Sequence, residues 1–249
     1  MLFRSAIEAR LYAEDPYAGF APQTGTVAWW RPQRALHGGV RIDDGIRGGA
    51  VISPFYDPMV AKIIVHGRDR DDAIRRLRAA LANAPLLGLK NNGRFLSDLV
   101  NHAAFREAAM TTTLIDQWLE QSEPILQEPV PGDEWWIVAA VAFAMQSGSS
   151  WRANSVAAYG LTLQCGDGVR TVRVTPDRHG QVAVAWEGVQ TSARVVDWTD
   201  GVLRVEVDGV AKTAIAVLSG SVLHLALGGH SFVFTEASRS EEHTSELQS

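Results

Sequence analysis

The second half of the chain holds eight short runs of β-forming residues at nearly regular spacing, and this pattern constrains the fold more than any other feature. The turns between the runs are rich in Gly, Asp and Ser, and Asp208-Gly209 and Gly228-Gly229 are typical two-residue hairpin loops. Such a series predicts an antiparallel meander. The runs cover residues 156–165, 169–175, 181–186, 191–197, 202–207, 210–218, 222–227 and 230–235.

A strongly apolar segment, EWWIVAAVAFAMQ at residues 134–146, comes before these runs and directly follows Asp133. Its apolar residues go almost all the way round a helix, so other elements must enclose it. A meander that closes around this helix would bury it and would leave no edge strand open. Residues 133–238 are therefore predicted to form an eight-stranded antiparallel β-barrel around a helix.

The first half of the chain is predicted to form a small β layer followed by helices, which makes the fold class of the whole chain α+β. Apolar and polar residues alternate over residues 6–14, as in a half-buried strand. Asp69 or Asp71 can cap a helix that Pro85 closes. Residues 1–121 are predicted to form this first domain, and the three prolines within residues 122–132 predict a linker. Further strands are expected at residues 25–30, 40–43 and 59–67, and further helices at 91–102 and 113–121.

Composition excludes several classes of protein. Hydrophobic residues make up 46% of the chain and charged residues 20%, which suits a folded protein, and a net charge of -5 argues against nucleic acid as the main partner. Cys165 stands alone, so neither an intramolecular disulfide nor a cysteine-based metal site is expected, and the expected location is the cytoplasm. No apolar run is long enough to span a membrane.

The tail at residues 239–249, RSEEHTSELQS, matches the translation of a common sequencing adapter. We therefore exclude it from the fold and expect an artificial C-terminus. Elsewhere the residues show no phosphate-binding glycine loop, no nucleophile elbow and no metal-ligand spacing.

Three segments nevertheless resemble one family. They are AIEARLYAEDP at residues 6–16, VRIDDGIRGG at 40–49 and SPFYDPMVAKIIVHGRDRDDAIRRL at 53–77. Together they are similar to the C-terminal portion of the biotin carboxylase domain in biotin-dependent acyl-CoA carboxylases, and the likeness extends over roughly residues 6–119. The combination of these motifs at these spacings is far more specific than any one of them.

The resemblance implies ATP-dependent carboxylation of biotin by bicarbonate through carboxyphosphate. It places the arginine of the E-x-R motif, Arg10, at the biotin and bicarbonate site, with Glu8 beside it. A guanidinium is always charged and offers a planar fork to an anion. The alternative is a surface arginine that only pairs with Glu8 or Asp57.

The resemblance also implies supporting roles. Asp57 either orients Arg10 or packs the turn before Pro58, and the second reading is the simpler one. Arg41 corresponds to an arginine near a dimer contact and is expected to be a scaffold or interface residue. Leu114 falls where the family places an apolar side chain against the adenine ring of ATP, although an ordinary core leucine would look the same.

Much of the machinery that the family uses is not in this chain. The glycine-rich ATP loop, the phosphate-binding lysines and the glutamates that hold Mg²⁺ or Mn²⁺ lie upstream in relatives. The Ala-Met-Lys-Met motif of the biotin carrier domain does not occur here either. The chain is therefore predicted to be a fragment of a ligase that is inactive alone.

The second half resembles the domain that docks such α subunits onto the carboxyltransferase β subunit, so the intact enzyme is expected to be a homo- and hetero-oligomer. Its helix is closer to the methylcrotonyl-CoA or geranyl-CoA type than to the propionyl-CoA type, but the acyl-CoA itself is chosen in the β subunit. Two alternatives stay open. One is a stand-alone, non-catalytic module for carboxylase assembly, and the other is a pyruvate or urea carboxylase, which would require fused carboxyltransferase sequence.

Overall fold

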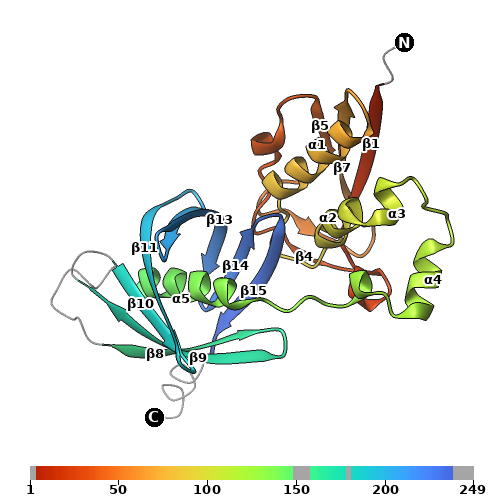
Figure 1. The fold of residues 1–249 in the computed structure, drawn as a ribbon. Helices are drawn as coiled ribbons and strands as arrows, with labels where there is room; N and C mark the ends of the chain where they lie inside the picture. Colours follow the sequence, from red (N-terminus) through yellow and green to blue (C-terminus); the bar gives the residue numbers. More distant parts are fainter. Residues whose placement is uncertain (1–3, 148–157, 178–180, 238–249) are drawn as a thin grey trace. The chain divides into compact units, whose positions relative to one another are not determined.

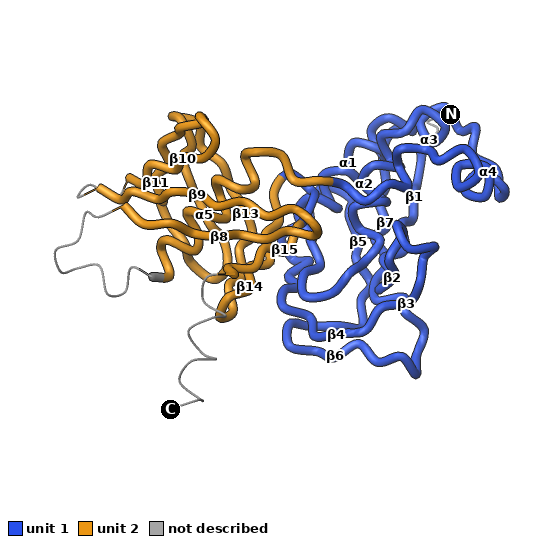
Figure 2. The backbone as a smooth tube through the Cα atoms, turned by 90° about the horizontal axis from the view of Figure 1, so that it is seen from below, with its two compact units in different colours: residues 1–129, 228–231 blue, residues 130–227, 232–249 orange. Residues whose placement is uncertain are grey.

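The computed structural model describes residues 4–147, 158–177 and 181–237 (Figure 1). The chain divides into two compact units, drawn in separate colours in Figure 2. Unit 1 contains Met1–Pro129 together with Gly228–Ser231, and unit 2 contains Val130–Leu227 and Phe232–Ser249. The predicted tail at residues 239–249 and the first residues of the predicted strand at 156–165 lie outside the described part of the chain.

Unit 1 is built on a three-stranded antiparallel sheet in the order β1-β7-β5. Its strands are β1 (Ser5–Tyr12), β5 (Val40–Asp44) and β7 (Met59–Gly67). Two small pairs of strands complete the β layer: β2 (Glu14–Asp15) with β3 (Ala21–Pro22), and β4 (Gly25–Thr26) with β6 (Val51–Ile52). The 3₁₀ helices η1 (Pro16–Ala18) and η2 (Pro32–Ala35) lie between them.

The helices of unit 1 follow the sheet. They are α1 (Arg70–Asn83), α2 (Gly93–Asn101), α3 (Ala103–Arg106) and α4 (Leu114–Gln121), followed by the 3₁₀ helix η3 (Pro124–Leu126). Helix α1 packs its apolar side, including Ala73 and Leu77, against the inward side chains of the sheet, such as Leu11, Ile63 and Val65. This cluster is the core of unit 1.

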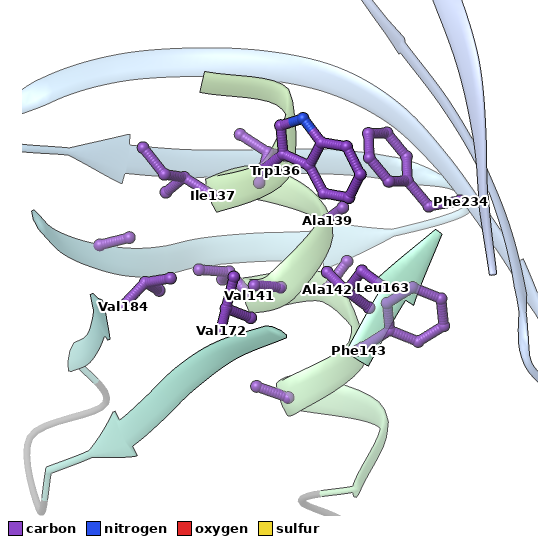
Figure 3. Packing of buried hydrophobic residues seen from close by; sticks show 14 of the residues in the cluster. Trp136, Ile137, Ala139, Val141, Ala142, Phe143, Leu163, Val172, Val184 and Phe234 are labelled. Atoms are coloured by element: carbon purple, nitrogen blue, oxygen red, sulfur yellow. The ribbon is translucent and has the colours of Figure 1, made fainter. Parts of the chain in front are cut away.

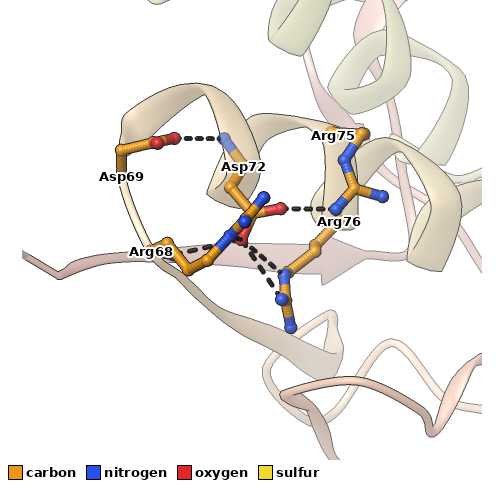
Figure 4. A network of polar contacts seen from close by, with 5 residues as sticks. All are labelled: Arg68, Asp69, Asp72, Arg75 and Arg76. Atoms are coloured by element: carbon orange, nitrogen blue, oxygen red, sulfur yellow. Dashed lines mark hydrogen bonds and ion pairs between the residues drawn. The ribbon is translucent and has the colours of Figure 1, made fainter.

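A carboxylate network fixes the start of α1. The side chain of Asp69 accepts a hydrogen bond of 2.8 Å from the backbone N–H of Asp72, as predicted for a cap. Asp72, only 3% exposed, binds the guanidinium groups of Arg68, Arg75 and Arg76 (Figure 4). The backbone N–H of Arg68 and the side chain of Arg75 hold the pKa of Asp72 well below its ordinary value. The network therefore neutralises a buried charge and favours the helix N-terminus.

Unit 2 is a closed antiparallel barrel of eight strands in the order β10-β11-β12-β13-β14-β15-β8-β9. The predicted fold class is confirmed, and every predicted run overlaps a strand. The strands are β8 (Tyr159–Cys165), β9 (Gly168–Pro176), β10 (Gln181–Trp186), β11 (Val189–Thr199), β12 (Val202–Val207), β13 (Val210–Ser219), β14 (Val222–Leu227) and β15 (His230–Glu236).

Helix α5 (Asp133–Ser147) packs inside this barrel. Its side chains from Trp136 to Ala144 are buried on all sides, and inward residues of the strands surround them (Figure 3). Trp136 meets Phe234 edge to face, with ring centroids 5.1 Å apart. At the helix start, Arg170 on β9 binds Asp133 at 2.7 Å and Lys212 on β13 binds Glu134 at 2.6 Å. Apolar packing and two ion pairs thus hold the helix in place.

Local geometry explains the turns, one wrong prediction and one helix that was not predicted. Asp208 and Gly209 both have positive φ, 47° and 79°, as a two-residue hairpin turn of type I′ requires. The strand predicted at residues 25–30 is wrong beyond Thr26, because Trp29 forms only an isolated bridge with Leu87. Helix α3 was not predicted, since it is a single turn capped by the side chain of His102.

In the described residues, no helix meets the length and hydropathy that a membrane crossing requires.

Candidate functional site

The exposed face of the β1-β7-β5 sheet carries the sequence-predicted arginine. Alternate residues of each strand point to opposite faces, so Ala9 and Leu11 face the core while Glu8 and Arg10 face outward. The strand register places Arg10 opposite Lys62 of β7. We call this surface the polar sheet face; its members are Glu8, Arg10, Arg41, Asp43, Lys62 and Ile64.

Arg10 is held at one edge of its guanidinium. Its Nε donates a hydrogen bond of 2.8 Å to Oε1 of Glu8, two residues earlier on the same strand. The side chains of Glu8 and Tyr12 raise the pKa of Arg10 by hydrogen bonding and by attraction. The side chain is still 57% exposed, so a ligand can reach it. The Arg10 to Glu8 pair considered from the sequence is therefore present, and it leaves the guanidinium accessible.

Arg41 forms a similar pair on the other edge of the polar sheet face. Its Nε and Nη2 each donate a hydrogen bond of 2.8 Å to one oxygen of Asp43, so both carboxylate oxygens are engaged. This bond from Arg41 is the main reason why the pKa of Asp43 is lowered. Between the two pairs lies Lys62, half-buried on the central strand. The sequence did not single out Lys62, because an isolated lysine in a strand carries no motif signal.

Asp57 lies in the loop before β7 and packs its turn. Its Oδ1 accepts a hydrogen bond of 2.8 Å from the backbone N–H of Met59. Burial, and then the negative charge of Asp57, raise the pKa of Glu14. No hydrogen bond or ion pair joins Asp57 to Arg10 within the described residues. The same loop exposes two aromatic side chains, Phe55 at 89% and Tyr56 at 82%.

Leu114 is placed apart from the polar sheet face, at the first residue of α4. It packs against a second small cluster formed by Phe95, Leu99 and Trp118. This position is that of a partly buried core leucine. The structure does not join it to Arg10, Glu8, Asp57 or Arg41 in one cluster.

The tryptophans of unit 2 belong mostly to its interior. Trp136 and Trp186 are 2% and 7% exposed, and both are part of the barrel core. Trp135 and Trp198 are partly buried and pack against the same core. Trp151 lies outside the described residues. Trp136 and Trp186 therefore stabilise the barrel core.

The described residues offer no cluster of three or more His, Cys, Asp or Glu side chains that could hold a metal ion. What they do offer is a surface with two arginine–carboxylate pairs and a lysine between them. Such a surface can bind and orient a small anion, because guanidinium and ammonium groups donate charge-assisted hydrogen bonds.

Comparison with known families assigns both halves of the chain. The biotin carboxylase C-terminal domain matches residues 8–117. The BT domain of the methylcrotonyl-CoA carboxylase α subunit matches residues 108–239, which is more than half of the chain.

Individual relatives agree with these matches. The mitochondrial methylcrotonoyl-CoA carboxylase subunit alpha of Oryza sativa is 39% identical over 113 residues, which are 45% of this chain and 15% of that protein. The propionyl-CoA carboxylase alpha chain of Ruegeria pomeroyi is 33% identical over 227 residues and covers 79% of this chain and 32% of its own length. The matched regions thus span about a third or less of these relatives.

Among solved structures, the biotin carboxylase subunit of pyruvate carboxylase is similar with a TM-score of 0.46 and 29% identity, over 50% of this chain and 26% of that one.

Proposed function

We propose that this chain completes a biotin carboxylase active site and docks it onto a partner subunit. The premise is that the chain belongs to the family of biotin-dependent acyl-CoA carboxylase α subunits, through its biotin carboxylase C-terminal domain and its BT domain. The reaction would be the carboxylation of biotin by bicarbonate with ATP. The observation that carries this proposal is the exposed guanidinium of Arg10 on the polar sheet face.

Arg10 suits the developing charge of this reaction. Its guanidinium stays protonated at every working pH and offers parallel N–H groups to a carboxylate-like anion. Glu8 fixes the Nε edge and so reduces the number of orientations that the side chain samples. A donor that is already oriented stabilises negative charge on bicarbonate or on the oxygen of biotin without reorganising. In this proposal Arg10 binds and orients the anion, and Glu8 positions Arg10.

Biotin, when bound, supplies the nitrogen that accepts the carboxyl group. For ATP and Mg²⁺ the fit is poor, because the described residues include no carboxylate cluster for a metal ion. The side chain of Leu114 is partly buried against its own core cluster. We therefore assign the binding of ATP and Mg²⁺ to an ATP-grasp region that is not in this sequence, and we derive no step through them.

We propose that unit 2 docks onto a carboxyltransferase β subunit. A biotin carrier domain would then move between the biotin carboxylase site and the carboxyltransferase site. The match to the BT domain supports this role. That match and the sequence of α5 favour the methylcrotonyl-CoA or geranyl-CoA type, although a propionyl-CoA carboxylase matches over a longer part of the chain. A cytoplasmic location remains a proposal that rests on the single cysteine.

The test compares this chain with a longer protein that carries an ATP-grasp region ahead of it. We expect bicarbonate-dependent ATP hydrolysis, with free biotin added, only in the longer protein. Hydrolysis by the present chain alone would overturn the assignment of the ATP site. Binding of a carboxyltransferase subunit by a longer protein without any ATP hydrolysis would instead favour the non-catalytic assembly module.

A further inference from the structure

Lys62 occupies the centre of the polar sheet face. It lies on β7, the middle strand, and its backbone is paired with Arg10 on one side and with Asp43 on the other. Directly opposed residues on one face of an antiparallel pair have Cβ atoms about 4.5–5.5 Å apart. The side chains of Lys62 and Arg10 therefore leave the sheet next to each other on the same face.

Among the described residues, the other two lysines each form an ion pair, and Lys62 does not. Lys90 binds Asp15 at 2.6 Å, and Lys212 binds Glu134 at 2.6 Å. Within the described residues, Lys62 makes neither a side-chain hydrogen bond nor an ion pair, although it is half-buried.

The neighbouring carboxylates explain why Lys62 has no such contact. Glu8 is bound by Arg10, and both oxygens of Asp43 are bound by Arg41. The positive charge of Lys62 still acts on them. The bond from Arg10 is the largest cause of the lowered pKa of Glu8, and attraction to Lys62 adds to it. Arg10 thus engages Oε1 of Glu8 and Arg41 engages both oxygens of Asp43, so three cations face two acids and Lys62 is the surplus cation of the face.

Two cations placed side by side in a sheet repel each other and destabilise the fold. Partly burying an ammonium adds the loss of its hydration. An anion between Arg10 and Lys62 would remove both penalties, because guanidinium can hold two oxygens of a planar oxyanion while ammonium binds the third.

We infer that Lys62 and Arg10 together form the binding site for a small oxyanion, and that Lys62 is a second residue for bicarbonate. This inference rests on the function proposed above. It adds a residue that no motif identified, and it assigns Lys62 to substrate binding and not to the fold.

The first test uses the longer protein with its ATP-grasp region. In Lys62→Met the KM for bicarbonate should rise about tenfold or more, the loss expected for one charge-assisted hydrogen bond. The KM for ATP should stay unchanged, and Lys62→Arg should recover most of the lost affinity. Lys212→Met, which removes a strand lysine from the barrel, is the matched control. An unchanged KM for bicarbonate in Lys62→Met overturns the inference and leaves the proposed function standing.

The second test needs no catalysis and uses the present chain. Lysine labelled with ¹³C at Cε gives three signals in this protein, because the chain has only Lys62, Lys90 and Lys212. Titration with sodium bicarbonate against sodium chloride of equal ionic strength should move the Lys62 signal to saturation and leave the other two in place. Arg10→Ala should weaken this response.

The two tests separate the possible failures. No bicarbonate-dependent ATP hydrolysis in the unsubstituted longer protein contradicts the proposed function, and the titration then decides the anion site by itself. A Lys62 signal that does not move, or three signals that move alike, overturns the anion site.

Discussion

Arg10 and Lys62 are paired residues of neighbouring antiparallel strands, and their side chains leave the same face of the sheet. The opposite face is covered by α1 and forms the core of unit 1. The sheet therefore separates two tasks: its inner residues stabilise the unit, and its outer residues present charge to a ligand. Substitutions on the two faces should have different consequences.

The first prediction concerns the Asp72 network. Asp72→Asn keeps the size of the side chain but removes the charge that binds Arg68, Arg75 and Arg76, so the urea midpoint of unit 1 should fall at neutral pH. The folded-state pKa of Asp72 lies well below its ordinary 3.8, chiefly because of the backbone N–H of Arg68 and the side chain of Arg75.

The pH dependence of this effect has a defined sign. When a folded-state pKa is lowered, the unfolded chain binds the proton first on acidification, so the stabilisation is complete above about pH 5 and is lost as the pH falls below about 4. The difference in urea midpoint between the unsubstituted protein and Asp72→Asn should therefore shrink in acid. A difference that persists unchanged at about pH 2 would exclude the charge of Asp72 as its cause.

The second prediction uses two glycines of unit 1. A Cβ at Gly67 would lie 2.3 Å from the backbone nitrogen of Ala73 and 2.8 Å from the backbone oxygen of Asp69, where neither atom can move freely. Gly67→Ala should lower the free energy of unfolding by about 1–3 kcal/mol, as overpacking does. Gly45 has no atom within 4 Å of such a Cβ, so Gly45→Ala should change stability by less than about 0.5 kcal/mol. Equal effects in urea unfolding would show that the close approach at Gly67 is absent.

The third prediction tests the direction of the side chains of β15. Phe234 is fully buried against Trp136, whereas its neighbour Val233 is 48% exposed. Phe234→Ala should destabilise unit 2 by about 3–5 kcal/mol, and Val233→Ala by less than about 1 kcal/mol. Tryptophan fluorescence in urea reports both, because Trp136 and Trp186 lie in the barrel core. A larger loss of stability for Val233→Ala than for Phe234→Ala would mean that Val233, and not Phe234, points into the barrel.

The barrel could be predicted from the sequence because each of its signals is local. Alternation with period two, turn dipeptides such as Asp208-Gly209 and one helix that is apolar all round leave few other arrangements. The predicted strands at residues 181–186, 202–207 and 222–227 agree with β10, β12 and β14 to the residue. Short elements without such signals, such as α3, could not be predicted.

The site was harder to predict, because it depends on which residues meet across strands. Arg10 was predicted through the resemblance of Glu8 and Arg10 to the E-x-R motif of the family, whose residues are neighbours in the sequence. Lys62 is 52 positions along the chain from Arg10, and only the register of β1 and β7 brings the two together. For the same reason, the sequence could not distinguish whether Asp57 contacts Arg10 or, as the structure shows, the backbone of Met59.

The role of Arg10 in the proposed reaction is tested most directly by bicarbonate-dependent ATP hydrolysis in the longer protein with Arg10→Ala. Arg173→Ala, an exposed arginine on β9 of the barrel, serves as the matched control. Since Arg10 is exposed and pairs only with groups at the surface, Arg10→Ala should remain folded by circular dichroism. Arg10→Ala should lose nearly all activity while Arg173→Ala keeps it; full activity in Arg10→Ala would exclude Arg10 from the reaction.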